Sequence, residues 1–162
     1  MNSVPTLHTE RCTLSAIAQS DIPVLRQILD DAETKRFLPE LCEEFSTTES
    51  LQQFIASFDK YLLHDEGILW GIRKEDMLIG FIAIMDISSN PTLFYAMHPY
   101  YRNNGYMKEC LKRTLHFLKK NDTIKNLQTE VFIDNFISRC LLNNVGFNLQ
   151  MIENQKTYYQ YY

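Results

Sequence analysis

The chain has 162 residues, of which 45% are hydrophobic and 22% charged, with a net charge of −4. These values are those of one globular domain of roughly 150 residues and exclude a disordered or fibrous chain. The acidic balance argues against nucleic-acid binding. The longest apolar run, Met77–Met85, falls well short of the about 20 residues of a membrane-spanning helix, and no signal peptide is visible. We therefore expect a single cytoplasmic domain, residues 1–162, without nucleic-acid or membrane partners.

The cysteines argue against a metal centre. They form no C-x-x-C pair and do not cluster with the histidines, as their positions show: Cys12, Cys42, Cys110 and Cys140. Such spacing predicts free thiols in a reducing compartment and no bound metal.

The first quarter of the chain predicts a strand followed by a helix. Thr13–Ala18 is expected to be the strand, with imperfect alternation. A helix then begins at Ser20 or Asp21, because apolar residues follow at helical spacing. Residues 31–45, with Pro39 among them, are expected to be less regular.

A second helix begins near residue 46. Ser46 and Glu49 have the spacing of a capping box, in which each side chain bonds the other residue's backbone amide. The apolar residues beyond it fall on one helical stripe: Leu51, Phe54, Ile55, Phe58 and Leu62.

Three strands follow. Gly67–Arg73 and Met77–Ile87 are joined by a polar turn at residues 74–76, and Thr92–Met97 is the third strand. Because Met77–Ile87 is apolar on both faces, we expect it at the centre of the sheet.

The last third predicts two helices and three strands. One helix begins after Gly105, Asn126–Phe132 is a strand, and a short helix around residues 137–141 ends at Gly146 in a left-handed cap. Phe147–Ile152 and Lys156–Tyr162 are expected to close the sheet. The whole order predicts an α+β (mixed α/β) fold, with one central sheet of about seven strands and about four helices.

The loop Arg102–Met107 has the features of a phosphate site. It joins an apolar strand to an amphipathic helix, so the first helical amides point outward without intrahelical acceptors. Gly105 allows close approach of an anion, and Arg102 and Lys108 add positive charge. A solvated loop with a helix cap is the alternative interpretation.

This segment resembles a known family. His98–Glu109, HPYYRNNGYMKE, is similar to the acetyl-CoA loop of the GNAT superfamily of N-acyltransferases, whose pattern is [QR]-x-x-G-x-[GA]. Asn135-x-x-Ser138 with the later Gly146-Phe147 resembles the family's N-x-x-S helix and its G-F end. Thr9-Glu10-Arg11 resembles the opening of the RimJ/RimL-like branch. The order of elements matches over residues 9–162.

The resemblance implies a mostly antiparallel GNAT-like sheet and a metal-independent N-acetyltransferase, in which a primary amine attacks acetyl-CoA directly. The acceptor is a protein N-terminus or a small-molecule amine. Backbone amides at the end of the strand that closes at Met97 act as an oxyanion hole, and Ser138 protonates the leaving thiolate. A structural role for Ser138 in the first helical turn is equally compatible, and a tyrosine often serves as the acid in other branches. The implied acetyl-CoA-binding residues are Met97, Arg102, Asn103, Asn104, Gly105, Tyr106, Met107, Lys108 and Asn135.

Three departures from the family pattern bear on function. Met107 stands where Gly or Ala is usual, Asn103 where glycine is common, and Thr92 where this branch often has Glu. Without that Glu, we expect a preference for acceptors of low pKa, such as α-amines, over lysine side chains.

The same departures leave an alternative open, a non-catalytic acyl-CoA-binding module. The acids that could replace the missing base are Asp86, Glu40, Glu43 and Glu44. The aromatic C-terminal strand is compatible with either a monomer or a homodimer.

Overall fold

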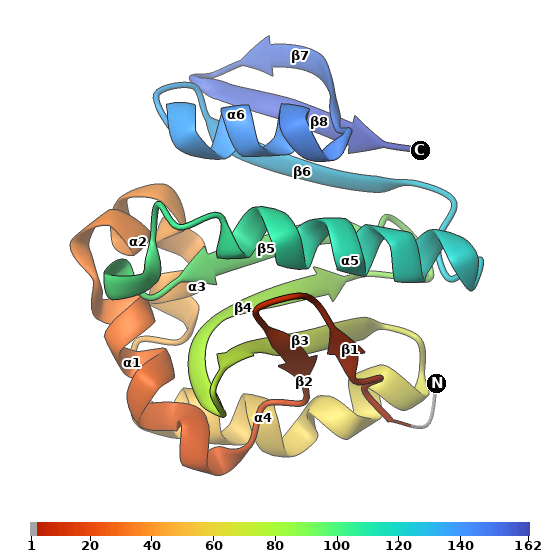
Figure 1. The fold of residues 1–162 in the computed structure, drawn as a ribbon. Coiled ribbons are helices and arrows are strands. Elements are labelled where there is room, and N and C mark those ends of the chain that lie inside the picture. Colours follow the sequence, from red (N-terminus) through yellow and green to blue (C-terminus); the bar gives the residue numbers. More distant parts are fainter. Residues whose placement is uncertain (1–2) are drawn as a thin grey trace.

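A computed structural model describes residues 3–162, and these form one eight-stranded sheet with six α-helices (Figure 1). The strand order is β1-β2-β3-β4-β5-β6-β8-β7, and every neighbouring pair is antiparallel except β5 and β6. The mixed α/β architecture expected from the sequence is therefore confirmed.

The strands are β1 (Leu7–His8), β2 (Thr13–Ser15), β3 (Gly67–Lys74), β4 (Met77–Met85), β5 (Thr92–Met97), β6 (Leu127–Phe132), β7 (Asn148–Glu153) and β8 (Lys156–Tyr161). The helices are α1 (Ile22–Asp30), α2 (Ala32–Phe37), α3 (Pro39–Glu44), α4 (Thr48–Leu63), α5 (Tyr106–Lys120) and α6 (Phe136–Val145). Short 3-10 turns, η1 (Gln19–Asp21) and η2 (Pro99–Tyr101), precede α1 and α5. None of the helices within residues 3–162 has the length and hydrophobicity needed to cross a membrane.

Residues 31–45 are more regular than the sequence suggested. They form α2 and α3, because the Asp31 side chain accepts a hydrogen bond from the Thr34 amide at 3.1 Å and so caps α2. Pro39 occupies the start of α3, where its missing N–H breaks no helical bond. The short β1, paired with β2, is the eighth strand that the sequence did not indicate.

The cap of α4 lies one residue later than expected. The hydroxyl of Thr47, not Ser46, accepts from the Ser50 amide at 3.1 Å. Thr47 has the extended backbone that an N-cap requires, which places Glu49 in the first turn, where its charge suits the helix dipole.

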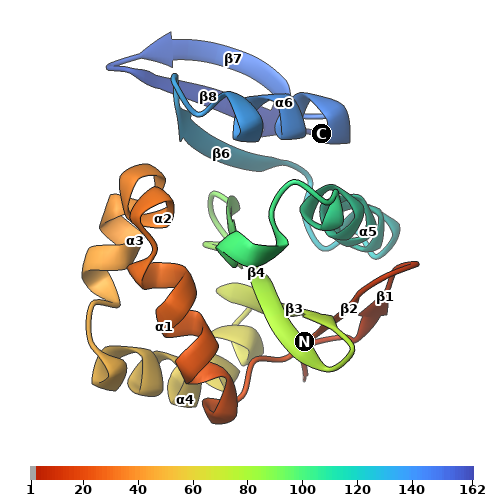
Figure 2. The same ribbon diagram turned by 60° about the vertical axis from the view of Figure 1, so that its left-hand side comes forward.

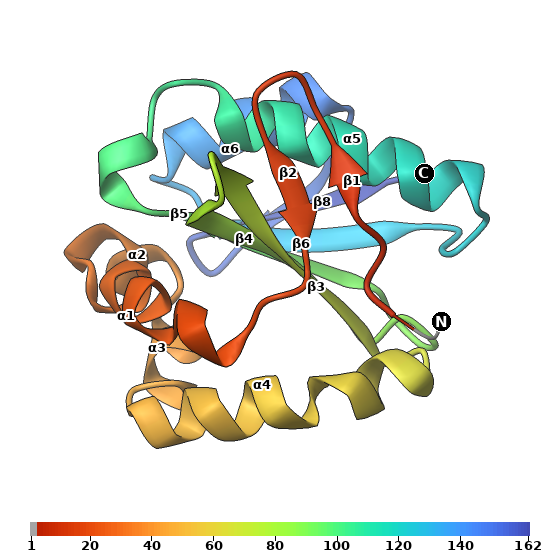
Figure 3. The same cartoon turned by 60° about the horizontal axis from the view of Figure 1, so that its bottom comes forward.

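Helices cover both faces of the sheet (Figures 2 and 3), and a hydrophobic core lies on each face. One core packs α5 and α6 against the sheet, and the other packs α1 and α4 against the opposite face. Side chains along β5 alternate between them: Leu93 and Met97 enter the first core, and Ala96 the second.

The sheet opens between β5 and β6. These parallel strands form one bridge, Thr92 with Gln128, whereas β4 and β5 remain paired along the whole of β5. The Gln128 amide donates to the Pro91 carbonyl at 2.9 Å, and the Thr129 hydroxyl donates to the Leu93 carbonyl at 2.9 Å. Beyond these bonds the strands diverge, and β6 continues with β8 (Figures 1 and 2).

The corrected cap gives a test of stability. We expect Thr47→Ala to lower the free energy of unfolding by about 1 kcal/mol, because the Ser50 amide loses its acceptor. Ser46→Ala is the matched control and is expected to change it by less than about 0.5 kcal/mol, since Ser46 is an exposed neighbour outside the cap. Urea unfolding of the two variants measures both values, and an equal loss in both would contradict the assignment.

Candidate active site

A pocket of about 350 Å³ occupies the opening between β5 and β6. Its walls come from both strands, from α2 and α3, from the loop before α5 and from the start of α6. The opening therefore brings together segments that lie up to about a hundred residues apart in the sequence.

Strand alternation divides this pocket into two halves. Tyr95 and Met97 point to the face covered by α5 and α6, whereas Phe94 and Ala96 point to the face covered by α1 to α4. On β6, Val131 packs with the first face, so Glu130 and Phe132 belong to the second. A molecule in the pocket can thus reach through the sheet from one half to the other.

The loop before α5 has the backbone geometry of an anion site. Asn103 and Gly105 both adopt positive φ, 63° and 79°, and Gly105 is the N-cap of α5. The amides of Tyr106, Met107 and Lys108 lie in the first turn and have no intrahelical acceptor, and the N-cap Gly105 provides no side-chain hydrogen bond to them. These amides form the N-terminal end of a 15-residue helix, and this end lies at the pocket. The helix dipole favours negative charge there.

The conformation of this loop also explains one departure from the family pattern. Asparagine tolerates the left-handed region better than most residues, so Asn103 can stand where glycine is common. Met107 is half-buried and packs against the α5–α6 core while lining the pocket. Asn104, by contrast, does not line the pocket among the described residues; its carbonyl accepts from Arg11.

Arg11 braces this loop from the N-terminal segment. Its Nε donates to Glu109 Oε2 at 2.8 Å, its backbone amide donates to Glu109 Oε1 at 2.8 Å, and its Nη1 donates to the Asn104 carbonyl at 2.9 Å. The guanidinium lies 4.5 Å from the centre of the Tyr106 ring. The Thr9-Glu10-Arg11 motif therefore contacts the first turn of α5, where Glu109 lies 98 residues after Arg11 in the sequence.

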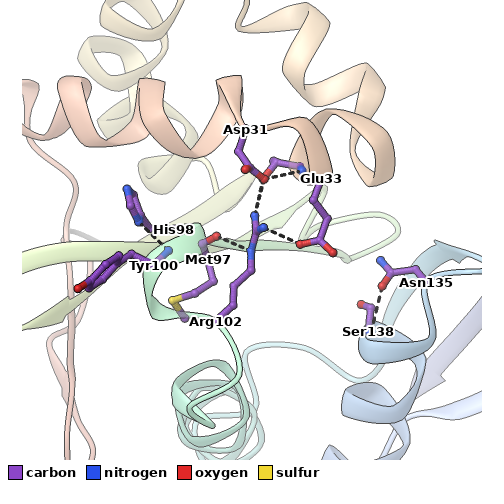
Figure 4. Close-up of polar contacts among 9 residues, drawn as sticks. Asp31, Glu33, Met97, His98, Tyr100, Arg102, Asn135 and Ser138 are labelled. Atoms are coloured by element: carbon purple, nitrogen blue, oxygen red, sulfur yellow. Dashed lines mark hydrogen bonds and ion pairs between the residues drawn. The ribbon is translucent and has the colours of Figure 1, made fainter.

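Arg102 faces into the protein instead of toward the helix start. Its Nε donates to the Met97 carbonyl at 3.2 Å, and its Nη atoms bond Glu33 at 2.5 Å and Asp31 at 2.7 Å (Figure 4). Two carboxylates thus share its charge, and because Arg102 also lines the pocket, its expected contact with an anion beside Gly105 stays a prediction. Lys108, which is exposed and lines the pocket, supplies the positive charge at that end.

The Arg102 contacts shift a neighbouring pKa. Burial alone raises the pKa of the Asp31 carboxyl, but hydrogen bonds from Arg102 and from the Thr34 amide outweigh it, so the pKa lies below its ordinary value. Asp31 therefore stays charged at neutral pH and holds both the cap of α2 and the guanidinium.

Ser138 and Asn135 meet at the start of α6, and a tyrosine that the sequence did not single out joins them. The Asn135 side chain accepts from the Ser138 amide at 3.2 Å and caps the helix (Figure 4). The Ser138 hydroxyl is hydrogen-bonded to the Tyr95 hydroxyl across the pocket. Burial raises the pKa of the Tyr95 phenol, so Tyr95 keeps its proton at neutral pH. Its signal in the sequence is a tyrosine on the strand that leads into the loop.

The backbone of β5 directs one more polar group into the pocket. The carbonyls of Pro91 and Leu93 accept from β6, and the Met97 carbonyl accepts from Arg102 on the same side. Alternation along the strand turns the Met97 amide to this side too, where β6 has already diverged. It therefore faces the opening between β5 and β6, and its expected role as an oxyanion-hole donor stays a prediction.

The carboxylates of the pocket differ from those expected. Of the four proposed replacements for the missing base, only Glu40 lines the pocket, together with Glu33 and Glu130, which the sequence did not indicate. Thr92 lies at the far end of β5, at the bridge with β6, and its hydroxyl donates to the Asn90 carbonyl. Its identity therefore says nothing direct about the base.

Other polar groups lie outside the pocket. The His98 ring accepts from the Tyr100 amide (Figure 4). Its Nε2 also bonds the Gln27 side chain at 3.0 Å. All four cysteines are free thiols. Within residues 3–162, no three His, Cys, Asp or Glu side chains are grouped as metal ligands would be.

Comparisons with known proteins agree with this geometry. The family model described as acetyltransferase (GNAT) domain matches residues 11–148. The chain therefore belongs to the GNAT acetyltransferase family and is an acyltransferase by class. A relative with 24% identity is the uncharacterized N-acetyltransferase YoaA of Bacillus subtilis (strain 168), with 95% of this chain and 89% of YoaA covered.

Solved structures share the fold at low identity. RimL, a ribosomal L7/L12 α-N-protein acetyltransferase in complex with coenzyme A, superposes with a TM-score of 0.84 at 14% identity, covering 97% of both chains. A GNAT-family acetyltransferase from Bacillus anthracis gives 0.79 at 16% identity, covering 97% of this chain and 98% of that one. The microcin C7 self-immunity acetyltransferase MccE, in complex with acetyl-CoA and AMP, gives 0.72 at 14%, covering 94% and 92%. At these identities the superpositions show a shared fold.

The Arg102 cluster predicts a pH-dependent contribution to stability. We expect Arg102→Gln to lower the free energy of unfolding by about 1–3 kcal/mol at pH 7, because two carboxylates lose a charged partner. Since the pKa of Asp31 is lower in the folded state, the contribution is present above about pH 4 and is lost as the pH falls through the folded pKa. Urea unfolding at neutral and acidic pH measures it.

Arg36→Gln is the control for this experiment. It breaks an ion pair with Asp134 whose side chains are 64% and 49% exposed, against 23% and 20% for Arg102 and Asp31. We expect a loss below about 1 kcal/mol. Equal losses of unfolding free energy in the two variants at neutral pH would show that the Arg102 cluster stabilises the fold no more than an exposed ion pair does.

Proposed function

We propose that this chain is a single-domain N-acetyltransferase that transfers the acetyl group of acetyl-CoA to a primary amine, on a protein N-terminus or a small molecule. The observation that carries the proposal is the opening between β5 and β6, where the free Met97 amide lies in the same pocket as the Ser138–Tyr95 hydroxyl pair. The unpaired cysteines fit a reducing, cytoplasmic setting.

The residues present fit acetyl-CoA as the donor. The amides of Tyr106, Met107 and Lys108 offer a binding place for the pyrophosphate, and Gly105 provides the left-handed backbone turn at which this helix starts. Asn135, at the start of α6, lines the path along the opening, where it can hold the pantetheine arm while capping the helix. The coenzyme A and acetyl-CoA complexes of RimL and MccE support this assignment.

The transfer needs no covalent enzyme intermediate. Acetyl-CoA supplies an activated thioester, and the nitrogen lone pair of the acceptor attacks its carbonyl carbon. A C–N bond forms, the C–S bond breaks, and the nitrogen loses a proton while the thiolate gains one. The Met97 amide donates to the carbonyl oxygen as negative charge develops on it.

Ser138 is the group placed to donate a proton to the departing thiolate. Its hydroxyl is buried at the start of α6 and is hydrogen-bonded to Tyr95, whose phenol remains protonated. Tyr95 can therefore resupply the proton to Ser138 or act in its place. Asn135 caps the backbone amide of Ser138, while the hydroxyl is bonded to Tyr95, so position 138 can cap the helix and take part in the chemistry at the same time.

The acceptor must reach the carbonyl as a neutral amine. Glu33 lies at the pocket beside Arg102, close to the end of β5, and can take up the proton directly or through water. An α-amine with a pKa near 8 is neutral about one time in ten at pH 7, far more often than a lysine amine. The preference for low-pKa acceptors stays a prediction: it holds if the neutral fraction of the acceptor, and not proton uptake by Glu33, limits the rate.

A non-catalytic acyl-CoA-binding module remains the second candidate. The observation that favours it is Met107, whose side chain lines the pocket where the family usually has Gly or Ala. The Tyr95–Ser138 pair weighs against it, because simple binding has no use for two protonated hydroxyls beside the free amide.

Donor binding is tested at Gly105. We expect Gly105→Glu to abolish the thermal stabilisation by acetyl-CoA, because a carboxylate then stands at the start of α5, where the pyrophosphate binds. Gly105→Gln is the control: it has the same size and the same strain at φ 79°, without the charge. Differential scanning fluorimetry with and without acetyl-CoA compares the two. A folded Glu variant that shifts as strongly as wild type would show that the donor binds elsewhere.

The acid is tested at Ser138. We expect Ser138→Ala to lower kcat by about 10²-fold while the affinity for acetyl-CoA stays nearly unchanged, because the bond is needed only as the thiolate forms. Tyr95→Phe is expected to act on the same step, and the double variant should lose less than the product of the two effects, since the hydroxyls form one pair. An unchanged kcat in both, with chemistry rate-limiting, would assign the proton to water.

A further inference from the structure

The half of the pocket that faces α2 and α3 has an apolar wall. Phe94 of β5, Phe132 of β6 and Phe37 of α2 contribute rings, and Leu38 and Leu41 complete the wall. All five side chains are half-buried, so each exposes part of its surface to the pocket. The donor loop and Ser138 belong to the other half, which leaves this wall to the acceptor.

Contacts on the outer side hold the wall in place. The Phe37 and Phe132 rings lie 6.5 Å apart, linking α2 to β6. An ion pair at 2.5 Å joins Arg36 to Asp134, just before α6, and the Arg36 guanidinium lies 4.8 Å from the Phe37 ring centre. Lys156 Nζ lies 5.5 Å from the Phe132 ring centre. The rings are thus pre-organised, and binding against them costs little ordering entropy.

Two of the three glutamates that line the pocket beside this wall are paired, and the third, Glu40, is exposed. Glu33 bonds Arg102 at 2.5 Å, and Glu130 bonds Lys156 at 2.6 Å. The hydrogen bond to Glu130 raises the pKa of Lys156, with a smaller contribution from Glu40 at the exposed rim. A second ammonium on the acceptor would therefore lose water in this half of the pocket without gaining a free buried carboxylate.

We propose that this apolar wall is the acceptor subsite and that it selects primary amines whose adjoining side group is aromatic or branched aliphatic. The inference rests on the proposed acetyl transfer and names its acceptor class. The amine passes between β5 and β6 toward the Met97 amide, while its side group packs on Phe37, Phe94 and Phe132. Acceptors with a cationic side group are disfavoured.

A set of amino-acid amides tests the acceptor class, because all of them present α-amines of comparable pKa. With acetyl-CoA saturating, we expect kcat/KM for phenylalaninamide and leucinamide to exceed that for glycinamide by about tenfold or more. Argininamide is expected to be no better than glycinamide. Product is identified by mass spectrometry. Equal values for phenylalaninamide and glycinamide, or a preference for argininamide, would overturn the proposal.

Two variants tie the preference to the wall. Phe132→Ala should lower the phenylalaninamide-to-glycinamide ratio by about tenfold, and Phe37→Ala gives an independent second test should the first variant not fold. Phe136→Ala is the matched control, because Phe136 is a nearby ring, 70% exposed, that does not line the pocket. It should keep the wild-type ratio. Thermal unfolding and acetyl-CoA binding establish that each variant is intact, and a wild-type ratio in both wall variants would refute the assignment.

The outcomes separate this inference from the function on which it rests. Acetyl-CoA binding without transfer to any amide or to a peptide N-terminus would defeat the proposed function, and the acceptor subsite with it. Transfer to all amides at equal kcat/KM would leave the proposed function standing and remove the apolar subsite alone.

Discussion

The candidate site depends on two neighbouring strands, β5 and β6, that stop pairing after one bridge. After the single bridge between Thr92 and Gln128, β5 and β6 separate, although β4 on the other side of β5 stays paired to the end of the strand. Unpaired backbone groups are costly inside a protein unless water or a ligand satisfies them, so the opening has to remain accessible. It turns the middle of a sheet into a passage between two faces, each covered by its own helices and its own core.

Arg102 makes the two halves of that passage interdependent. It is the first residue after η2, on the way from β5 to α5, yet its guanidinium reaches the N-cap of α2 through Asp31 and bonds Glu33 in the first turn of that helix. The loop that offers amides to the donor and the helix that walls the acceptor half therefore share one anchor. A displacement of either segment strains the same charged cluster, in which Arg102 and Asp31 are half-buried and Glu33 is more exposed.

Local signals explain which parts could be predicted from the sequence. The bounds of β5 and the left-handed Gly105 and Gly146 follow from neighbouring residues, and the structure reproduces them. The Tyr95–Ser138 pair joins residues 43 apart, and the direction of Arg102 depends on carboxylates about 70 positions away. No spacing rule encodes such contacts, because they exist only once the sheet has brought β5, α2 and α6 together.

The division of the pocket also bears on how this fold serves different substrates. The proposed donor half is built from a loop, a helix start and a helix cap, which are backbone features that many sequences can satisfy. The acceptor half is built from side chains on two short helices, α2 and α3, and on the even-numbered positions of β5 and β6. Substituting those side chains changes the wall without disturbing the strand divergence or the amides at the start of α5. Selectivity for the acceptor can therefore vary while donor binding is retained, and it has to be determined from the residues of α2, α3 and β6 in each chain.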